Sequence, residues 1–321
     1  MKGKYTLGVG LNLFDARAIL LEGTDKIIAQ IDKKRKNTTA NDAIQVILEL
    51  CEGIISKTQK FKDKISRIGL ALGGVVDKKK GIVYWPQRVD SNYVYIGIPL
   101  KKHLEDKFSI PVVVENDANA CVWAEHLRNF PKNNNIIYLF SGVGCGLLIN
   151  GSLFRGKNGA AGEVFINQQK VMASYLGDFS FLKPWPLDLG VVKRAKELIT
   201  LGKSTSLIKN ITPTGVLKFE EIINAANKKD RLSKEVLKES AFSLGVKLSL
   251  LINLFDPEVV VIGGGFEEAG ELFLDEVNKA VKKFSFSEMR KNLKIVLSKL
   301  GKAATSLGAA LIAIEENPLH Q

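Results

Sequence analysis

Apolar and polar positions alternate with two different periods in the first 60 residues. Residues 5–9 and 16–21 are apolar and partly β-branched, which is typical of two short strands joined by a tight turn. Residues 39–60 then carry apolar side chains at helical spacing, from Ile44 to Ile54. A hairpin followed by an amphipathic helix is the beginning expected of an α/β protein.

The same alternation continues along the rest of the chain. The runs "IGLAL", "IPVVVE", "NNIIYLF" and "VVVIGGG" predict buried strands, with helical patterns between them. Asn150 and Gly151 are the residue pair favoured by a type I′ hairpin turn. Residues 167–190 are the least regular part, and a length of 321 residues suggests about two α/β domains.

Composition narrows the class of protein. No apolar run reaches the roughly 18–20 residues of a membrane span, and the first strand follows the amino terminus without a signal-peptide core. We therefore expect a cytoplasmic protein with no membrane partner. Cys51, Cys121 and Cys145 are far apart, so neither a disulfide framework nor a zinc set is expected.

The net charge of +12 raises the question of nucleic-acid binding. The lysines are scattered among glutamates, and the dense basic runs at 32–36 and 77–80 fall where turns are expected. Solvated turns are the favoured interpretation. The first strand starts by residue 5, with no helix-turn-helix before it, so no direct nucleic-acid binding is expected.

The stretch "VVVENDANACVWAEH" is the most informative candidate site. Glu115, Asn116 and Asp117 stand where a strand meets a helix. Asn116 or Asp117 suits the helix N-cap. A carboxylate at the carboxyl end of a strand also lies where α/β sheets bind ligands, and it can accept a proton from a hydroxyl. Capping and catalysis both remain open from spacing alone.

A first glycine-rich segment follows at "SGVGCG". Gly142, Gly144 and Gly146 share one face of a strand, where backbone amides can approach an anion closely, and Ser141 adds a hydroxyl. Close packing of a hairpin on another backbone explains the pattern equally well.

A second glycine-rich segment, Gly263, Gly264 and Gly265, lies between a strand and a helix. It can hold a nucleotide over the helix N-terminus, but it lacks the spacing of a dinucleotide or Walker motif. Tight strand–helix packing is the alternative.

Glu163 follows the flexible stretch "GKNGAAG" and is either a hydroxyl acceptor or an ordinary exposed glutamate. His103, His126 and His320 include no pair with metal-ligand spacing, so no metal site is expected.

Taken in order, the "VENDANA" block, "SGVGCGLLINGSLFRGKNGAAGE" and "DPEVVVIGGGFEEAG" resemble the ROK family of bacterial sugar kinases and sugar-responsive transcriptional repressors. The resemblance covers nearly the whole chain. It implies the two-domain actin-like ATPase fold of sugar kinases, with a smaller domain of residues 1–115 and 307–321 and a larger one of 116–306. It also implies a sugar between the domains and, in the kinases, a nucleotide beneath it.

The resemblance assigns roles to matching positions. Asp117 matches the general base that activates a sugar hydroxyl, and Asn116 and Glu163 match sugar ligands. Two segments match the phosphate and nucleotide side of the kinases: Ser141, Gly142, Gly144 and Gly146, and Gly263, Gly264 and Gly265.

The first turn departs from the kinase pattern. The kinases have an aspartate, two glycines and a threonine where this chain has Gly10, Asn12, Leu13 and Phe14. Glycine cannot help to hold Mg²⁺, and large side chains replace the bare amides that phosphate oxygens need. Asp15 lies one place past the turn and is not expected to compensate.

The zinc motif of the family is also missing. Its histidine is replaced by Ile166, and residues 167–190 lack its cysteine cluster, so no zinc is expected. Gln87 and Asp188 fall near positions at which the family contacts the sugar, which suggests a shifted specificity.

The favoured hypothesis is therefore a sugar- or polyol-binding sensor or regulator that has lost efficient kinase activity, in a homodimer. Without a winged helix, any effect on transcription needs a separate DNA-binding partner. An ATP-dependent sugar kinase that uses ATP and Mg²⁺, with Asp117 as general base, is the alternative. A structural subunit that binds neither ligand is the third.

Overall fold

The computed structural model divides into two compact units, which are described separately below. Unit 1 comprises Met1–Asn134, Cys145–Gly162 and Lys302–Gln321, and unit 2 comprises Asn135–Gly144 and Glu163–Gly301. The structure describes residues 5–11, 15–35, 39–89, 92–140, 144–164, 190–210 and 217–316.

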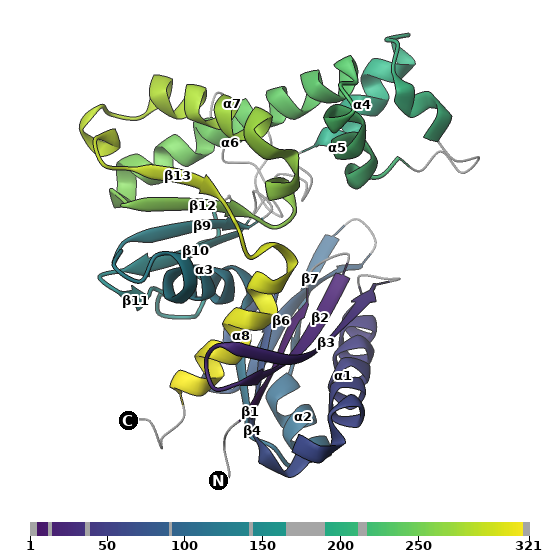
Figure 1. Ribbon diagram of the computed structural model, residues 1–321, viewed down its shortest axis with the longest axis vertical. Coiled ribbons are helices and arrows are strands. Elements are labelled where there is room, and N and C mark those ends of the chain that lie inside the picture. Colours follow the sequence, from purple (N-terminus) through teal and green to yellow (C-terminus); the bar gives the residue numbers. More distant parts are fainter. Residues whose placement is uncertain are drawn as a thin grey trace. The chain divides into compact units, whose positions relative to one another are not determined.

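Unit 1 is built on a five-stranded mixed sheet with the strand order β3-β2-β1-β4-β8 (Figure 1). The first three strands form an antiparallel meander, whereas β4 and β8 continue the sheet in parallel with β1. Every residue of β1 is buried, as expected for a central strand that is covered on both faces. The strands are β1 (Tyr5–Leu11), β2 (Asp15–Glu22), β3 (Lys26–Lys34), β4 (Ile65–Leu72) and β8 (Val112–Asn116).

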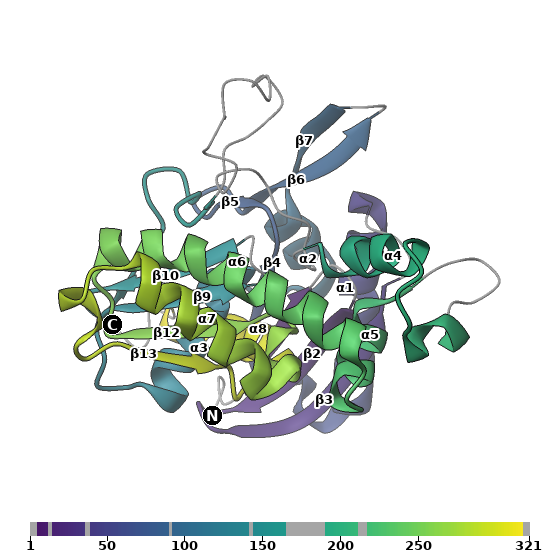
Figure 2. The same ribbon diagram turned by 90° about the horizontal axis from the view of Figure 1, so that it is seen from above.

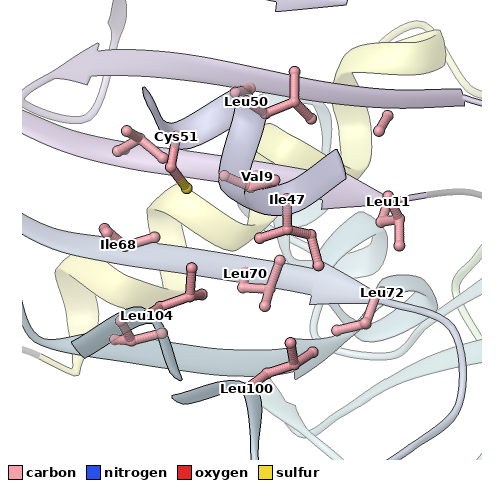
Figure 3. Close-up of a cluster of buried hydrophobic side chains, with 14 of the residues drawn as sticks. Val9, Leu11, Ile47, Leu50, Cys51, Ile68, Leu70, Leu72, Leu100 and Leu104 are labelled. Atoms are coloured by element: carbon pink, nitrogen blue, oxygen red, sulfur yellow. The ribbon is translucent and has the colours of Figure 1, made fainter. Parts of the chain in front are cut away.

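Helix α1 (Ala40–Lys57) covers one face of this sheet. It begins where the apolar spacing predicts, and Thr39 caps it by accepting a hydrogen bond from the amide of Asp42 at 3.2 Å. Its side chains Ile47 and Leu50 meet the buried strand residues in Figure 3. Helix α2 (Leu100–Phe108) adds further apolar side chains to the same core, and a 3₁₀ turn, η1 (Gln59–Lys64), follows α1.

Helices α3 (Asp117–Asn129) and α8 (Ala304–Glu315) pack so closely that their backbones are in contact. A Cβ atom on Gly308 would lie 1.8 Å from the carbonyl oxygen of Ala120. A Cβ on Gly69 of the sheet would lie 2.0 Å from the carbonyl oxygen of Ala309. Only glycine permits these approaches. The small residues of α8 therefore serve close packing, and this packing holds α3 in place relative to the sheet.

Two smaller β elements complete unit 1. A three-stranded sheet has the order β5-β6-β7, in which β6 and β7 form a long ribbon (Figure 2). A second hairpin, β10–β11, turns at Asn150 and Gly151, which both have positive φ values of 52° and 75°, in agreement with the predicted type I′ turn. The strands are β5 (Val75–Asp77), β6 (Ile82–Val89), β7 (Asn92–Ile98), β10 (Gly144–Ile149) and β11 (Ser152–Leu153).

Unit 2 contains three parallel strands, β9 (Ile136–Phe140), β12 (Val259–Gly263) and β13 (Lys294–Leu297). The long helix α6 (Arg231–Phe255) packs on α7 (Gly270–Phe284) (Figure 1). A Cβ on Gly245 would lie 2.6 Å from the carbonyl oxygen of Val277, so a glycine is needed at this crossing. The remaining elements are α4 (Val191–Thr200), α5 (Phe219–Asn227), η5 (Ser206–Asn210), η6 (Phe266–Ala269), η7 (Glu288–Arg290) and η8 (Gly301–Ala303).

The division into units follows packing rather than the order of the chain. Helix α3 belongs to unit 1 because it packs on α8, and the β10–β11 hairpin joins the same unit. The three cysteines are buried and none of them forms a disulfide, and burial raises the pKa of Cys51 to about 12. Across the described part of the chain, none of the helices is both long enough and apolar enough to span a bilayer.

Candidate functional site

The polar cluster predicted at "VVVEND" lies at the junction of β8 and α3 in unit 1. Asn116 is the N-cap of α3, because its side-chain oxygen accepts hydrogen bonds from the amides of Ala118 (2.9 Å) and Asn119 (3.2 Å). Its side-chain nitrogen donates to the carbonyl oxygen of Gly74 at 3.2 Å. The open question of which residue caps the helix is thereby answered in favour of Asn116.

Asp117 is the first residue of α3 and is only 8% exposed. Its Oδ1 accepts a hydrogen bond from the amide of Ala118 at 2.8 Å. A Cβ built on Gly73 would lie 3.4 Å from its Oδ2, so this oxygen faces the bend between β4 and β5. An acidic side chain in this first turn is stabilising, because the N-terminus of a helix carries a partial positive charge. The carboxylate of Asp117 can therefore accept a proton through Oδ2, while Oδ1 is hydrogen-bonded to the first turn of α3.

Glu115 is a buried carboxylate, 3% exposed, that is tied to both sides of the junction. Its Oε1 accepts hydrogen bonds from the amide of Asn116 (2.9 Å) and from the side-chain nitrogen of Asn119 (3.0 Å). Its Oε2 accepts from Nε of Arg155 at 2.6 Å. A buried charge is costly unless it is paired and hydrogen-bonded, and Glu115 is both.

Arg155 is the site residue that sequence reasoning missed. It follows β11, 40 residues after Glu115, and its Nη2 also lies 3.8 Å from Oε1 of Glu316. Glu316 in turn pairs with Lys78 in the turn after β5. Only an arginine in "LFRG" and an acidic residue at a buried strand end hinted at this pair in the sequence.

The first glycine-rich segment is only partly described, because Ser141 and Gly142 lie outside the described residues. Gly144 forms an isolated antiparallel bridge with Glu163. A Cβ on Gly146 would lie 2.1 Å from the carbonyl oxygen of Ala118, so Gly146 serves the packing of β10 on α3. At this position the packing alternative explains the glycine.

Glu163 is exposed by its accessible surface, but the protein atoms around its carboxyl partly desolvate it, which raises its pKa above the ordinary value. Its bridge to Gly144 places it in unit 2. A carboxyl of this kind can accept or donate a hydrogen bond, which suits a polyol.

The second glycine-rich segment follows β12 in unit 2. A Cβ on Gly263 would lie 1.8 Å from the hydroxyl of Tyr138, so this glycine makes room for an aromatic side chain. Gly264 and Gly265 form the turn after β12, and their positive φ values of 72° and 103° favour glycine at both positions. The amide of Gly265 donates to a carboxylate oxygen of Glu267 at 2.8 Å. A negative side chain therefore binds the amide of a glycine that the sequence analysis considered as a nucleotide contact.

The first turn is described only at its two ends, and Asn12, Leu13 and Phe14 lie outside the described residues. A Cβ on Gly10 would lie 2.7 Å from the amide nitrogen of Ser306 and 2.9 Å from Cβ of Thr305, so no larger side chain fits there. Asp15 lies in β2, with Oδ2 3.9 Å from Nζ of Lys302.

Three further predicted positions, Gln87, Ile166 and Asp188, lie wholly or partly outside the described residues. Gln87 lies in β6 opposite Val94, but its side chain is outside the described part. Asp188 and Ile166 lie outside the described residues, as does most of the region 167–190. Within the described ranges, no group of three or more histidine, cysteine or acidic side chains is placed to hold a metal ion.

The chain has the actin-like fold of sugar kinases, which is built from two α/β units. One unit carries the polar strand–helix junction, and the other carries the glycine turn after a strand. The chain belongs to the ROK family, whose model matches residues 8–168 and 200–316. Both the recognition of the family and the fold class predicted from the sequence are thereby confirmed.

The relatives of the chain include both transcriptional repressors and sugar kinases. It is similar to a xylose repressor of Caldicellulosiruptor bescii, with 30% identity over 284 residues, 85% of this chain and 68% of the relative. It is also similar to a glucokinase of Halalkalibacterium halodurans, with 27% identity over 274 residues, 83% of this chain and 82% of the relative. Among solved structures, a ROK glucokinase of Streptomyces griseus in complex with glucose and AMPPNP matches with a TM-score of 0.77 and 25% identity, covering 96% of this chain and 99% of that one.

Proposed function

We propose that the chain is a sugar- or polyol-binding ROK protein of the sensor or regulator type, without efficient kinase activity. One observation carries this proposal. Gly10 stands where the kinases have an aspartate, and its backbone packs directly on Thr305 and Ser306 of α8. No carboxylate can occupy this position without moving α8, so the Mg²⁺ handling of a kinase has no counterpart there.

The sugar would bind at the β8–α3 junction. Asn116 uses its oxygen for the helix cap and one amide hydrogen for Gly74, which leaves one N–H for a hydroxyl. Asp117 accepts further hydrogen bonds from hydroxyls. Glu163, Gln87 and Asp188 are proposed as further sugar-binding residues, as the resemblance implies.

Nucleotide binding is expected to be weak. Gly146 and Gly263 are accounted for by packing, and Glu267 binds the amide of Gly265. The resemblance gives Ser141, Gly142, Gly144, Gly146 and Gly263–Gly265 as nucleotide contacts; if a nucleotide binds, we propose Ser141, Gly142, Gly144, Gly264 and Gly265, the members that packing does not already explain. ATP and Mg²⁺ would then be its cofactors, and no zinc site is proposed.

The second candidate function is an ATP-dependent sugar kinase. The observation in its favour is Asp117, a carboxylate at a helix N-terminus in the place of the general base. The glucokinases among its relatives are consistent with it. A cytoplasmic homodimer is proposed in either case.

Calorimetry and a coupled kinase assay distinguish these functions. We expect one of D-xylose, D-glucose or N-acetyl-D-glucosamine to bind with micromolar Kd, and no phosphorylation of that sugar with ATP and Mg²⁺. A turnover of about 1 s⁻¹, the low end of typical enzyme rates, would overturn the sensor proposal. If the protein binds none of the three sugars and no member of a wider polyol panel, both the sensor and the kinase functions are excluded, and a structural subunit remains.

A further inference from the structure

The strand–helix junction depends on a single cation that lies far from it in the sequence. Among the described residues, the Glu115 carboxylate accepts hydrogen bonds from one cationic side chain, Arg155, at 2.6 Å. The guanidinium is itself 27% exposed, whereas the carboxylate is buried. The ion pair therefore neutralises a charge that would otherwise be costly to bury.

Glu115 spreads the effect of this pair over the whole junction. The same carboxylate binds the amide of Asn116 before Asp117 and the side chain of Asn119 after it. One group thus holds the backbone amide of the residue before Asp117 and the side chain of Asn119 after it. A shift of Glu115 by a fraction of an ångström would be transmitted to the two side chains proposed to contact the sugar.

The segment that carries Arg155 is fixed to unit 1 at several points. The carbonyl oxygen of Arg155 accepts a hydrogen bond from the amide of Ala161 at 3.1 Å, and Gly156 and Gly159 have positive φ values of 68° and 73°. A Cβ on Gly159 would lie 2.1 Å from the carbonyl oxygen of Val76. Oε1 of Glu316 lies 3.8 Å from Nη2 of the guanidinium.

We propose that Arg155 is a positioning residue of the sugar site, which acts through the Glu115 carboxylate to hold Asn116 and Asp117 in place. This inference rests on the proposed sugar-binding function of the junction. Arg155 does not itself touch the ligand. It supplies the charge and the directed Nε–H donor that keep Glu115 in its buried position.

The test measures sugar affinity and stability separately. The probe is whichever of D-xylose, D-glucose and N-acetyl-D-glucosamine binds the wild type most tightly by calorimetry. Arg155→Gln is expected to raise Kd about tenfold or more, because small misplacements of binding groups are costly. Arg155→Lys keeps the charge but lacks the planar donor, so we expect a Kd between those of the wild type and Arg155→Gln.

A double variant separates positioning from a general loss of stability. In Glu115→Gln/Arg155→Gln the amide oxygen can still accept from Asn116 and Asn119, while no charge is buried. We expect Kd to return to within about threefold of the wild type, since coupled neighbours are not additive. The control is Arg128→Gln, which breaks an ion pair with exposed Asp25 at the other end of α3 and should leave Kd unchanged.

The outcomes are distinct. If the wild type binds a sugar and Arg155→Gln binds it equally well, the inference is wrong while the proposed function stands. If Arg155→Gln is too unstable to assay, Arg155→Lys decides, because a Kd equal to that of the wild type would then overturn the inference. If the wild type binds no sugar, the proposed function itself has failed.

Discussion

Asp117 combines two roles within one carboxylate group. One oxygen binds the helix amide of Ala118 and the other faces the bend at Gly73. A group that is held by the helix on one side keeps a fixed direction on the other, which is what both a sugar ligand and a general base require. The side chain therefore does not by itself distinguish a sensor from a kinase.

Substitution of Asp117 makes this distinction. In a kinase, Asp117→Asn should lower kcat by about 10²–10⁴-fold, because the proton acceptor is lost. In a sensor, the amide still offers one oxygen to a hydroxyl, so Kd should rise by less than about tenfold. Calorimetry and the kinase assay on the same preparation check this, with Asp25→Asn on the exposed surface as the control.

Glu163 allows a prediction from pH dependence. Desolvation raises the pKa of its carboxyl in the folded state above the ordinary value. The folded protein then holds the proton more tightly than the unfolded chain, so stability from this group is present below the ordinary pKa, about 4.3, and is lost as pH rises through the raised value.

Glu163→Gln removes this loss, because a neutral amide carries no charge to desolvate, and the effect is small because Glu163 is exposed. We expect the Tm of the variant at pH 7–8 to equal or exceed that of the wild type, with the difference shrinking towards about pH 4, while sugar affinity falls. Thermal melts over this pH range check the first part and calorimetry the second. A lower Tm at neutral pH would contradict the desolvation argument, and Glu52→Gln on the surface of α1 is the control.

At the scale of elements, the approach of α3 to α8 depends on glycine. Gly308→Ala places a methyl group 1.8 Å from the carbonyl oxygen of Ala120, so one helix must move. We expect a loss of about 1–3 kcal/mol in the free energy of unfolding, measured by denaturant titration.

Gly53→Ala is the matched control, in the middle of helix α1. There the new methyl group meets only the flexible end of Ile31, at 2.9 Å. Alanine also has the higher helix propensity, by roughly 0.5–1 kcal/mol. Equal destabilisation by the two variants would show that backbone packing at Gly308 is not the cause.

The elements themselves could be predicted from the sequence, because their signals are local. The apolar spacing of residues 39–60 gave α1, and Asn150-Gly151 gave the hairpin turn. The partners of individual groups could not be predicted in this way. Gly146 and Gly263 read equally well as phosphate contacts, since the atoms that fill their space, Ala118 and Tyr138, come from other elements.

The same reason explains the omission of Arg155 from the predicted site. Its partner Glu115 lies 40 residues earlier, and the two meet only when the β10–β11 hairpin packs beside β8 and α3. The polar residues at the β8–α3 junction were found because a strand end and a helix start leave a sequence signal.

At the scale of the whole molecule, ligand binding should appear as added stability. A sugar present at 100 times its Kd should add about 2.7 kcal/mol to the free energy of unfolding, by mass action. We expect a thermal shift with the binding sugar and none with ATP and Mg²⁺ alone. A shift with nucleotide alone would contradict the proposed weakness of the nucleotide side, and a non-binding sugar of the same panel serves as the control.

The position of α8 in the chain also governs how the protein folds as it is made. Strands β1 and β4 emerge early from the ribosome, but the helix that covers their second face is translated only after residue 303. Residues 163–301 of unit 2 form a nearly continuous segment that can acquire its structure first. Until α8 has been translated, the glycine-lined face of the first sheet therefore lacks this cover and is a surface that chaperones can bind.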